Sequence, residues 1–240
     1  PKAESFNVSK DGDKSIVKVT YRFPQVDAQW EITYKVFANG IIKVDNRFVA
    51  EGTETPMIPR VGLRMQLSEI LNDLTYYGRG PEENYRDRRT SQFIGEYTTP
   101  IKDLYEPYIR PQENEHHTDI YWCALTTKQK AGLLFIADRT FELNASNYLL
   151  GSLDSGETID NGAPRTNETN HRHLTDPQPV KQVDMFIDYR MMGVGGDNSW
   201  GAIAHEPYLI RPGVENTIEY GFSIVPFDKK ADYKNLIYQY

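Results

Sequence analysis

The chain has 240 residues, which is enough to bury a sizeable core as one large all-β domain. Its formal net charge is −7 and its only basic cluster, residues 86–89, is interrupted by an acid, which excludes a nucleic-acid-binding surface. The longest apolar run, residues 133–137, is far too short to span a bilayer, and no signal segment opens the chain. The lone Cys123 rules out an internal disulfide and is expected to be buried.

Apolar and polar residues alternate with a period of two along most of the chain, a pattern typical of half-buried strands. A hairpin turn is predicted at residues 10–13 and a strand at 17–23. A second alternating run, residues 30–38, passes through Asn39-Gly40 into residues 41–49, which is the strongest short signal for a hairpin. Further strands are predicted at 61–67, 118–126, 132–138, 140–145, 183–190 and 214–225. This pattern predicts an all-β sandwich.

Residues 1–228 are predicted to form a single domain, followed by a tail at 229–240 where a short helix would fit the sequence. The longest irregular stretch runs from Gly151 to Gln182 and receives no assigned role. The chain begins at Pro1 rather than Met, so we expect the natural N-terminus to lie further upstream.

The most informative loop spans residues 193–201, where four glycines, an Asp-Asn pair and a serine surround Trp200. Glycine reaches positive φ without penalty, and Asp197 and Asn198 can bond their own backbone to tighten the turn. Three glycines are predicted to shape the loop: Gly193, Gly195 and Gly196. The indole of Trp200 is then either a wall that covers the apolar face of a ligand or a plug over the edge of the core.

Six motifs occur in a fixed order: residues 59–64, 77–88, 105–114, 144–148, 171–174 and 196–200. In that order they resemble the C-terminal domain of bacterial β-galactosidases of glycoside hydrolase family two, across roughly residues 15–226. The resemblance implies a large antiparallel β-supersandwich similar in fold to galactose mutarotases. It also implies that the loop tryptophan, Trp200 here, reaches into an active site built by a separate barrel domain. Asp197 and Asn198 are assigned with it as substrate-binding residues.

The function implied by the resemblance is that of a domain within a retaining enzyme that hydrolyses terminal β-D-galactosides. Its expected partners are the galactoside and the catalytic barrel domain, with a homo-oligomer as a further option. No cofactor is expected in this chain, whereas metal ions remain an option for the full enzyme. A soluble bacterial protein of cytoplasm or periplasm is expected. Two alternatives stay open: a freestanding carbohydrate-binding module and an aldose 1-epimerase-like protein.

Glycoside hydrolysis usually requires two carboxylates that flank the scissile bond. Three acidic pairs stand out: Glu82-Glu83, Glu113 with Glu115, and Asp184 with Asp188. None lies in an apolar context expected to raise one pKa and leave the other low. No catalytic residue is therefore assigned, and the catalytic glutamates are expected outside this chain.

His171 and His173 are the best metal candidates, because residues two apart share a face on a strand. A zinc site would need further ligands and an open position. Glu168 and the pair His116-His117 would have to be supplied by the fold. We predict that His171 and His173 are structural and assign no metal site.

Four arginines recur beside Gly and Pro turns: Arg60, Arg64, Arg79 and Arg88. Pairing with Glu82, Glu83 or Asp87 is predicted to hold these loops together.

Two departures from the family pattern stand out. Residues 113–119 read Glu-Asn-Glu-His-His-Thr-Asp where the family often has Glu-Asn-Gly-Asn-Arg-Thr-Asp, and Asn198 replaces a second aspartate. The first departure puts in doubt any contact that the family makes there.

Overall fold

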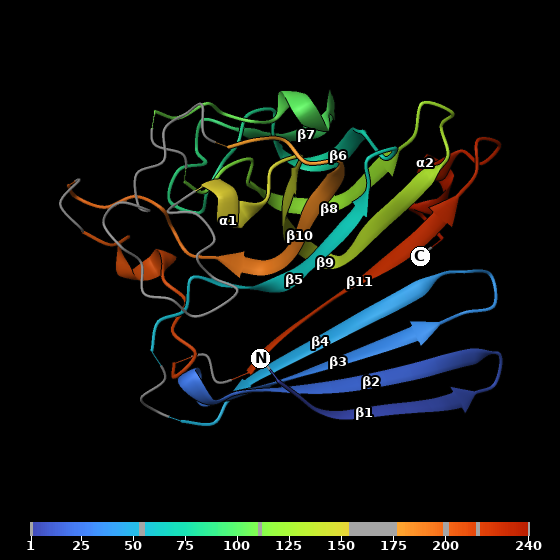
Figure 1. Cartoon of the computed structure of the whole chain (residues 1–240), viewed down its shortest axis with the longest axis horizontal. Coiled ribbons are helices and arrows are strands. Elements are labelled where there is room, and N and C mark those ends of the chain that lie inside the picture. Colours follow the sequence, from blue (N-terminus) through green and yellow to red (C-terminus); the bar gives the residue numbers. More distant parts are fainter. Residues whose placement is uncertain are drawn as a thin grey trace.

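The computed structural model describes residues 2–52, 56–109, 112–153, 177–198, 202–214 and 217–239. Strands dominate this part of the chain (Figure 1). The strands are β1 (Lys2–Asp11), β2 (Lys14–Phe23), β3 (Ala28–Val36), β4 (Ile42–Ala50), β5 (Arg60–Ser68), β6 (Asp73–Gly80), β7 (Phe93–Pro100), β8 (His117–Thr126), β9 (Gly132–Ser146), β10 (Gln182–Met191) and β11 (Thr217–Phe227). The α-helices α1 (Leu150–Leu153) and α2 (Tyr233–Leu236) and the 3-10 turns η1 (Pro24–Val26), η2 (Ile101–Asp103) and η3 (Glu206–Tyr208) are short.

The strands form one antiparallel sheet in the order β1-β2-β3-β4-β11-β9-β8-β6-β7, while β10 pairs with β9 and β5 pairs with β10. The sheet divides at β9. Residues 132–137 of β9 pair with β11, whereas residues 142–146 pair with β10. Figure 1 shows the layer of β1 to β4 diverging from the layer that contains β5 and β10. The predicted all-β class and the large antiparallel supersandwich are confirmed.

The two turns predicted from Gly-containing pairs are both present. Gly40 adopts a φ of 86° between β3 and β4, and the side chain of Asn39 accepts a hydrogen bond from Ile41 N at 3.2 Å. Gly12 adopts a φ of 64° between β1 and β2. Both residues occupy the left-handed region, where glycine carries no Cβ penalty.

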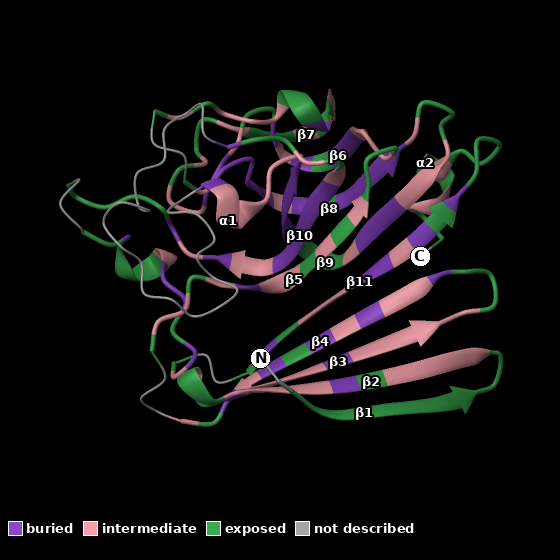
Figure 2. Ribbon diagram, viewed as in Figure 1, coloured by how far each residue is buried: buried purple, intermediate pink, exposed green. Residues whose placement is uncertain are grey.

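The main core lies between the diverging layers. Its largest fully buried side chains include Leu74, Tyr76, Phe135, Met185 and Phe222. Each large apolar side chain removed from water contributes about 1.5–3 kcal/mol to folding. Figure 2 shows burial concentrated on β8 to β11, while β1 is exposed along its length. Cys123 is fully buried as predicted, and burial raises the pKa of its thiol.

Several elements differ from the sequence predictions. Strands β1, β6 and β7 were not predicted, and β9 is one continuous strand rather than two. Asp138 and Arg139 are exposed at the point where β9 changes its partner from β11 to β10, which we call the fork. These polar residues interrupt the apolar pattern of β9 at the fork, and no turn forms there. In the tail, helical structure is confined to α2. No helix in the described ranges is long and apolar enough to cross a membrane.

Candidate functional site

The loop predicted to carry the site leaves the end of β10. Its first residues are tied to two distant segments: Met192 N donates to Pro59 O at 2.9 Å, and Gly193 N donates to Tyr208 O at 2.8 Å. Because both bonds join backbone groups, the path of the loop at its start is fixed by the residue that precedes strand β5 and by turn η3.

Asp87 holds the next two residues of the loop. Its carboxylate accepts hydrogen bonds from Val194 N at 3.2 Å and from Gly195 N at 2.7 Å, one to each oxygen. Charge-assisted bonds to successive backbone amides are stronger than neutral ones. Asp87 lies more than 100 residues away in sequence, so it clamps the loop onto the segment between β6 and β7.

The loop glycines are needed because other atoms approach their Cα atoms closely. Positive φ was the expected reason for glycine at these positions, and it is not the reason found. None of Gly193, Gly195 and Gly196 adopts a φ in the left-handed region. A Cβ at Gly193 would lie 2.5 Å from Asp87 Oδ2, and one at Gly196 would lie 2.3 Å from the carbonyl oxygen of Ala202. Their loop-shaping role remains a prediction.

The far end of the described loop is exposed. The carboxylate of Asp197 lies 2.7 Å from Nε2 of His205, and both side chains face solvent. Asn198 is exposed as well. Trp200 lies outside the described residues, as do His171 and His173. The structure therefore brings Asp197 and Asn198 to an accessible loop tip without testing what they bind.

Replacing Asp87 with alanine is expected to free both loop amides and to lower the free energy of unfolding by about 1–2 kcal/mol. Asp87→Asn retains one acceptor oxygen and should cost less. Urea unfolding measures the stability, and limited proteolysis followed by mass spectrometry reports cleavage within residues 193–198. An Asp87→Ala protein as stable and as protease-resistant as the wild type would show that Asp87 does not hold the loop.

Beneath the loop lies a buried polar network centred on Glu142, which is 3 % exposed. Glu142 accepts a hydrogen bond from Met191 N at 2.6 Å, at the end of β10, and from Arg86 Nη1 at 3.2 Å. Its other contact is Nε2 of His116 at 3.1 Å. Glu142 thus anchors both the base of the loop and the residue next to Asp87.

The bonds around His116 fix its charge. Asn144 Nδ2 donates to Asn114 O at 2.6 Å, so Asn144 Oδ1 is free to accept from His116 Nδ1 at 2.7 Å. Nε2 donates to the Glu142 carboxylate, so both ring nitrogens carry protons and the ring is an imidazolium. Burial opposes this charge, but the bond to Glu142 and its charge outweigh burial and raise the pKa of His116.

Burial also perturbs three neighbouring groups. It lowers the pKa of His117 to about 4, and it raises the pKa of Glu115 to about 8. It raises the pKa of Asp188 to about 7, although Arg60 opposes that shift. The expectation that none of the three acidic pairs lies in a context that raises one pKa was therefore wrong for the pairs that contain Glu115 and Asp188. Glu115 and Asp188 are fully buried, however, so neither can contact a substrate in this structure.

One of the four predicted arginine pairings is present. Arg88 pairs with Glu83, as predicted. The other arginines find partners elsewhere: Arg60 with Glu113 and Asp188, Arg64 with Asp184, and Arg79 with Asp119. These ion pairs join strands to neighbouring strands and loops, which gives them a structural role.

A groove of about 760 Å³ lies in the fork and includes Arg86 from the network. Three of its carboxylates are ion-paired: Asp45 to Lys35, Asp138 to Lys43 and Glu219 to Arg47. The first and third pairs join neighbouring strands, and the second joins β4 to β9, which both flank β11. The groove is therefore a mixed-charge surface beside the loop.

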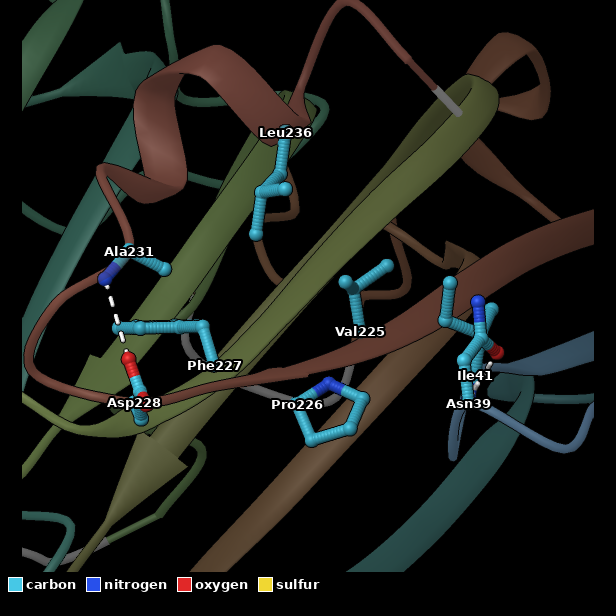
Figure 3. A pocket seen from close by; sticks show the side chains of 8 residues that line it. All are labelled: Asn39, Ile41, Val225, Pro226, Phe227, Asp228, Ala231 and Leu236. Carbon is cyan, nitrogen blue, oxygen red and sulfur yellow. Dashed lines mark hydrogen bonds between the residues drawn. The ribbon is translucent and has the colours of Figure 1, made fainter.

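A second groove, of about 520 Å³, lies between the turn of the β3–β4 hairpin and α2 (Figure 3). Its floor is apolar and includes Ile41, Val225 and Phe227. The Asp228 carboxylate accepts from two backbone amides, at 2.8 and 3.1 Å, and caps the turn before α2. Asp228 is the acidic residue among those that line this groove, and its carboxylate is engaged in that cap. Across the described ranges, no cluster of three His, Cys, Asp or Glu side chains is arranged to hold a metal.

The chain is similar in sequence to known proteins. The family model described as "Beta galactosidase small chain" matches residues 2–224. The β-galactosidase of Priestia megaterium is 31% identical over 212 residues, which cover 82% of this chain and 19% of that protein. The β-galactosidase of Streptococcus thermophilus is 31% identical over 214 residues, 85% of this chain and 19% of its own length. The chain thus spans about a fifth of the length of these relatives.

Proposed function

The chain belongs to the beta-galactosidase small chain family, and on that premise we propose that its loop at residues 193–201 completes the sugar pocket of a β-galactosidase. In this proposal Trp200 forms an aromatic wall, with Asp197 and Asn198 beside it as substrate-binding residues. The chain packs against the catalytic barrel domain that supplies the rest of the pocket. The substrate is a terminal β-D-galactoside.

The anchoring of the loop is the observation that carries this proposal. A binding wall must be rigid, because ordering a mobile loop on binding costs free energy. Asp87 clamps two successive loop amides, and Glu142 fixes the strand end from which the loop leaves. An indole presented from such a loop can cover the apolar face of a sugar while its N–H donates to a hydroxyl.

Catalysis itself is assigned to carboxylates outside this chain. A retaining glycosidase needs two carboxyl groups about 5–5.5 Å apart at the scissile bond. In the described part of the chain, the carboxyl groups with raised pKa are Glu115 and Asp188, and both are buried. This supports a division of labour in which the chain shapes the pocket and another region performs hydrolysis.

The isolated chain is therefore expected to fold and to leave nitrophenyl β-galactoside intact. The measurement is the release of nitrophenol by the purified chain, beside a calorimetric titration with galactose and polarimetry of α-galactose mutarotation. All three should be negative, because the loop provides only one side of a pocket.

A positive result would contradict the proposal in a specific way. Hydrolysis that survives rigorous purification and is lost in Glu115→Gln or Asp188→Asn would assign catalysis to this chain. Galactose binding by the chain alone would favour a carbohydrate-binding module, and faster mutarotation would favour an epimerase.

A further inference from the structure

Strand β1 leaves one edge of the sheet open. Within the described ranges β1 pairs with β2 alone, and Figure 1 shows it along the lower border of the molecule. Residues 3–10 are exposed, and two of them are large and apolar: Phe6 is 69% exposed and Val8 is 58% exposed. An exposed edge that carries apolar side chains is a template on which another strand can pair.

Phe6 and Val8 continue the face of the sheet that covers the core. Phe6 lies opposite Val19 of β2, which in turn lies opposite Ile32 of β3, a member of the main core. Val8 lies opposite Val17 in the same way. Because directly opposite residues of antiparallel strands share a face, apolar rows run from the core to the open edge.

The backbone of β1 is regular over most of this edge. A bulge or a proline in the middle of an edge strand discourages pairing with another chain. The ladder between β1 and β2 is irregular only between Ala3 and Ser5, near one end, and residues 2–11 contain no proline. Residues 5–11 therefore present an edge that a further strand can follow.

The hairpin turn shows which backbone groups face outward. Asp11 and Lys14 close a two-residue loop, so they form a hydrogen-bonded pair of the ladder. Successive residues of an antiparallel strand direct their N–H and C=O groups alternately to one side and the other. The backbone groups of Phe6, Val8 and Lys10 therefore point away from β2, toward the open edge.

The side chains of β1 are complementary to a second copy of β1 in one antiparallel register. With Asn7 on the twofold axis, Phe6 of each copy lies opposite Val8 of the other. In the same register Lys10 lies opposite Glu4, the residue at the bulge. Both contacts are favourable, because apolar groups meet apolar groups and a cation meets an anion. Other registers in phase place a charge opposite an apolar side chain, such as Lys10 opposite Phe6.

We propose that the open edge of β1, residues 4–10, is a dimerisation surface on which a second copy of this chain pairs its own β1 antiparallel about Asn7. The pairing makes the sheet continuous through both copies and covers Phe6 and Val8. A twofold contact of this kind closes on itself, so it forms a dimer and not a filament. The surface is independent of the sugar-pocket proposal, which concerns residues 193–201.

Sedimentation equilibrium of the purified chain, from micromolar to near-millimolar concentration, measures the association. A single pair of strands is a small interface, so we expect a weak dimer that dissociates on dilution. Lys10→Glu places like charges opposite each other at both ends of the contact and should weaken the dimer by about tenfold. Glu4→Lys combined with Lys10→Glu exchanges the two charges and should restore it.

Lys18→Glu is the matched control. It makes the same charge change at an exposed lysine of β2, one strand inward from the edge, and should leave the dimer unchanged. Equal melting temperatures of the wild type and the variants show that each variant is folded.

Amide exchange measured by NMR gives a second readout at single residues. In the dimer the N–H groups of Phe6 and Val8 bond the second copy, whereas those of Asn7 and Ser9 bond β2 with or without a partner. The protection of the first two amides should rise with protein concentration, and that of the other two should not change.

Four outcomes would overturn the proposal. The first is a chain that stays monomeric over the whole concentration range, and the second is a dimer that Lys10→Glu weakens no more than Lys18→Glu does. The third is a folded charge-exchange variant that remains monomeric. The fourth is protection of Phe6 and Val8 that does not depend on concentration, which would show that another segment of the same molecule covers the edge. None of these readouts involves a sugar, so they are separate from the tests of the sugar pocket.

Discussion

Replacing Glu142 with alanine is expected to lower the free energy of unfolding by about 3–5 kcal/mol, because removing one partner of a buried ion pair leaves the other charge uncompensated. The His116 imidazolium is fully buried and would lose its carboxylate partner. Arg86 and the Met191 amide would lose their acceptor at the same time. Urea unfolding followed by circular dichroism measures the loss.

A matched control separates the network from ion pairs in general. Glu219 pairs with Arg47 at 3.2 Å, but the two side chains are 66% and 51% exposed. Exposed pairs contribute about 0–1 kcal/mol, so Glu219→Ala should change stability little. If Glu142→Ala costs no more than Glu219→Ala, the buried network does not support the fold as described.

The sequence predicted most of the sheet because its strands bury one face. Alternation identified the hairpin of β3 and β4, and Asn39-Gly40 located its turn. Strand β1 was not predicted; it is an exposed edge strand whose large apolar side chains, Phe6 and Val8, are exposed to solvent. The fork at β9 escaped prediction because it depends on which strands pair with each half of β9, and sequence alternation carries no information about partners.

The candidate site was predictable only in its local part. The glycines and the Asp197-Asn198 pair marked a loop from their own chemistry. Asp87 as the clamp was not predicted, because its partners lie more than 100 residues away. A signal was present, since Asp87 belongs to one of the six quoted motifs. The raised pKa values of Glu115 and Asp188 arise from burial in the folded protein, which neighbouring residues in sequence do not reveal.

Trp200→Ala is expected to weaken binding of a β-galactoside to the assembled enzyme by about tenfold to a hundredfold. The reason is the loss of roughly 1–3 kcal/mol of apolar contact with the sugar. The isolated chain should lose much less than the ~3–5 kcal/mol that truncation of a buried Trp costs. Steady-state kinetics of the enzyme and urea unfolding of the chain measure the two effects. Tyr238→Ala, at an aromatic residue 89% exposed in the tail, is the matched control and should change neither.

The most direct test of the sugar-pocket proposal is therefore the dissociation constant of a non-hydrolysed β-galactoside analogue for the assembled enzyme, wild type against Trp200→Ala. The proposal predicts a dissociation constant raised by about tenfold or more, with the isolated Trp200→Ala chain unfolding at nearly the same urea concentration as the wild type. An unchanged dissociation constant together with an early-unfolding chain would show that Trp200 is a plug over the core edge and that the pocket wall is assigned to the wrong residue.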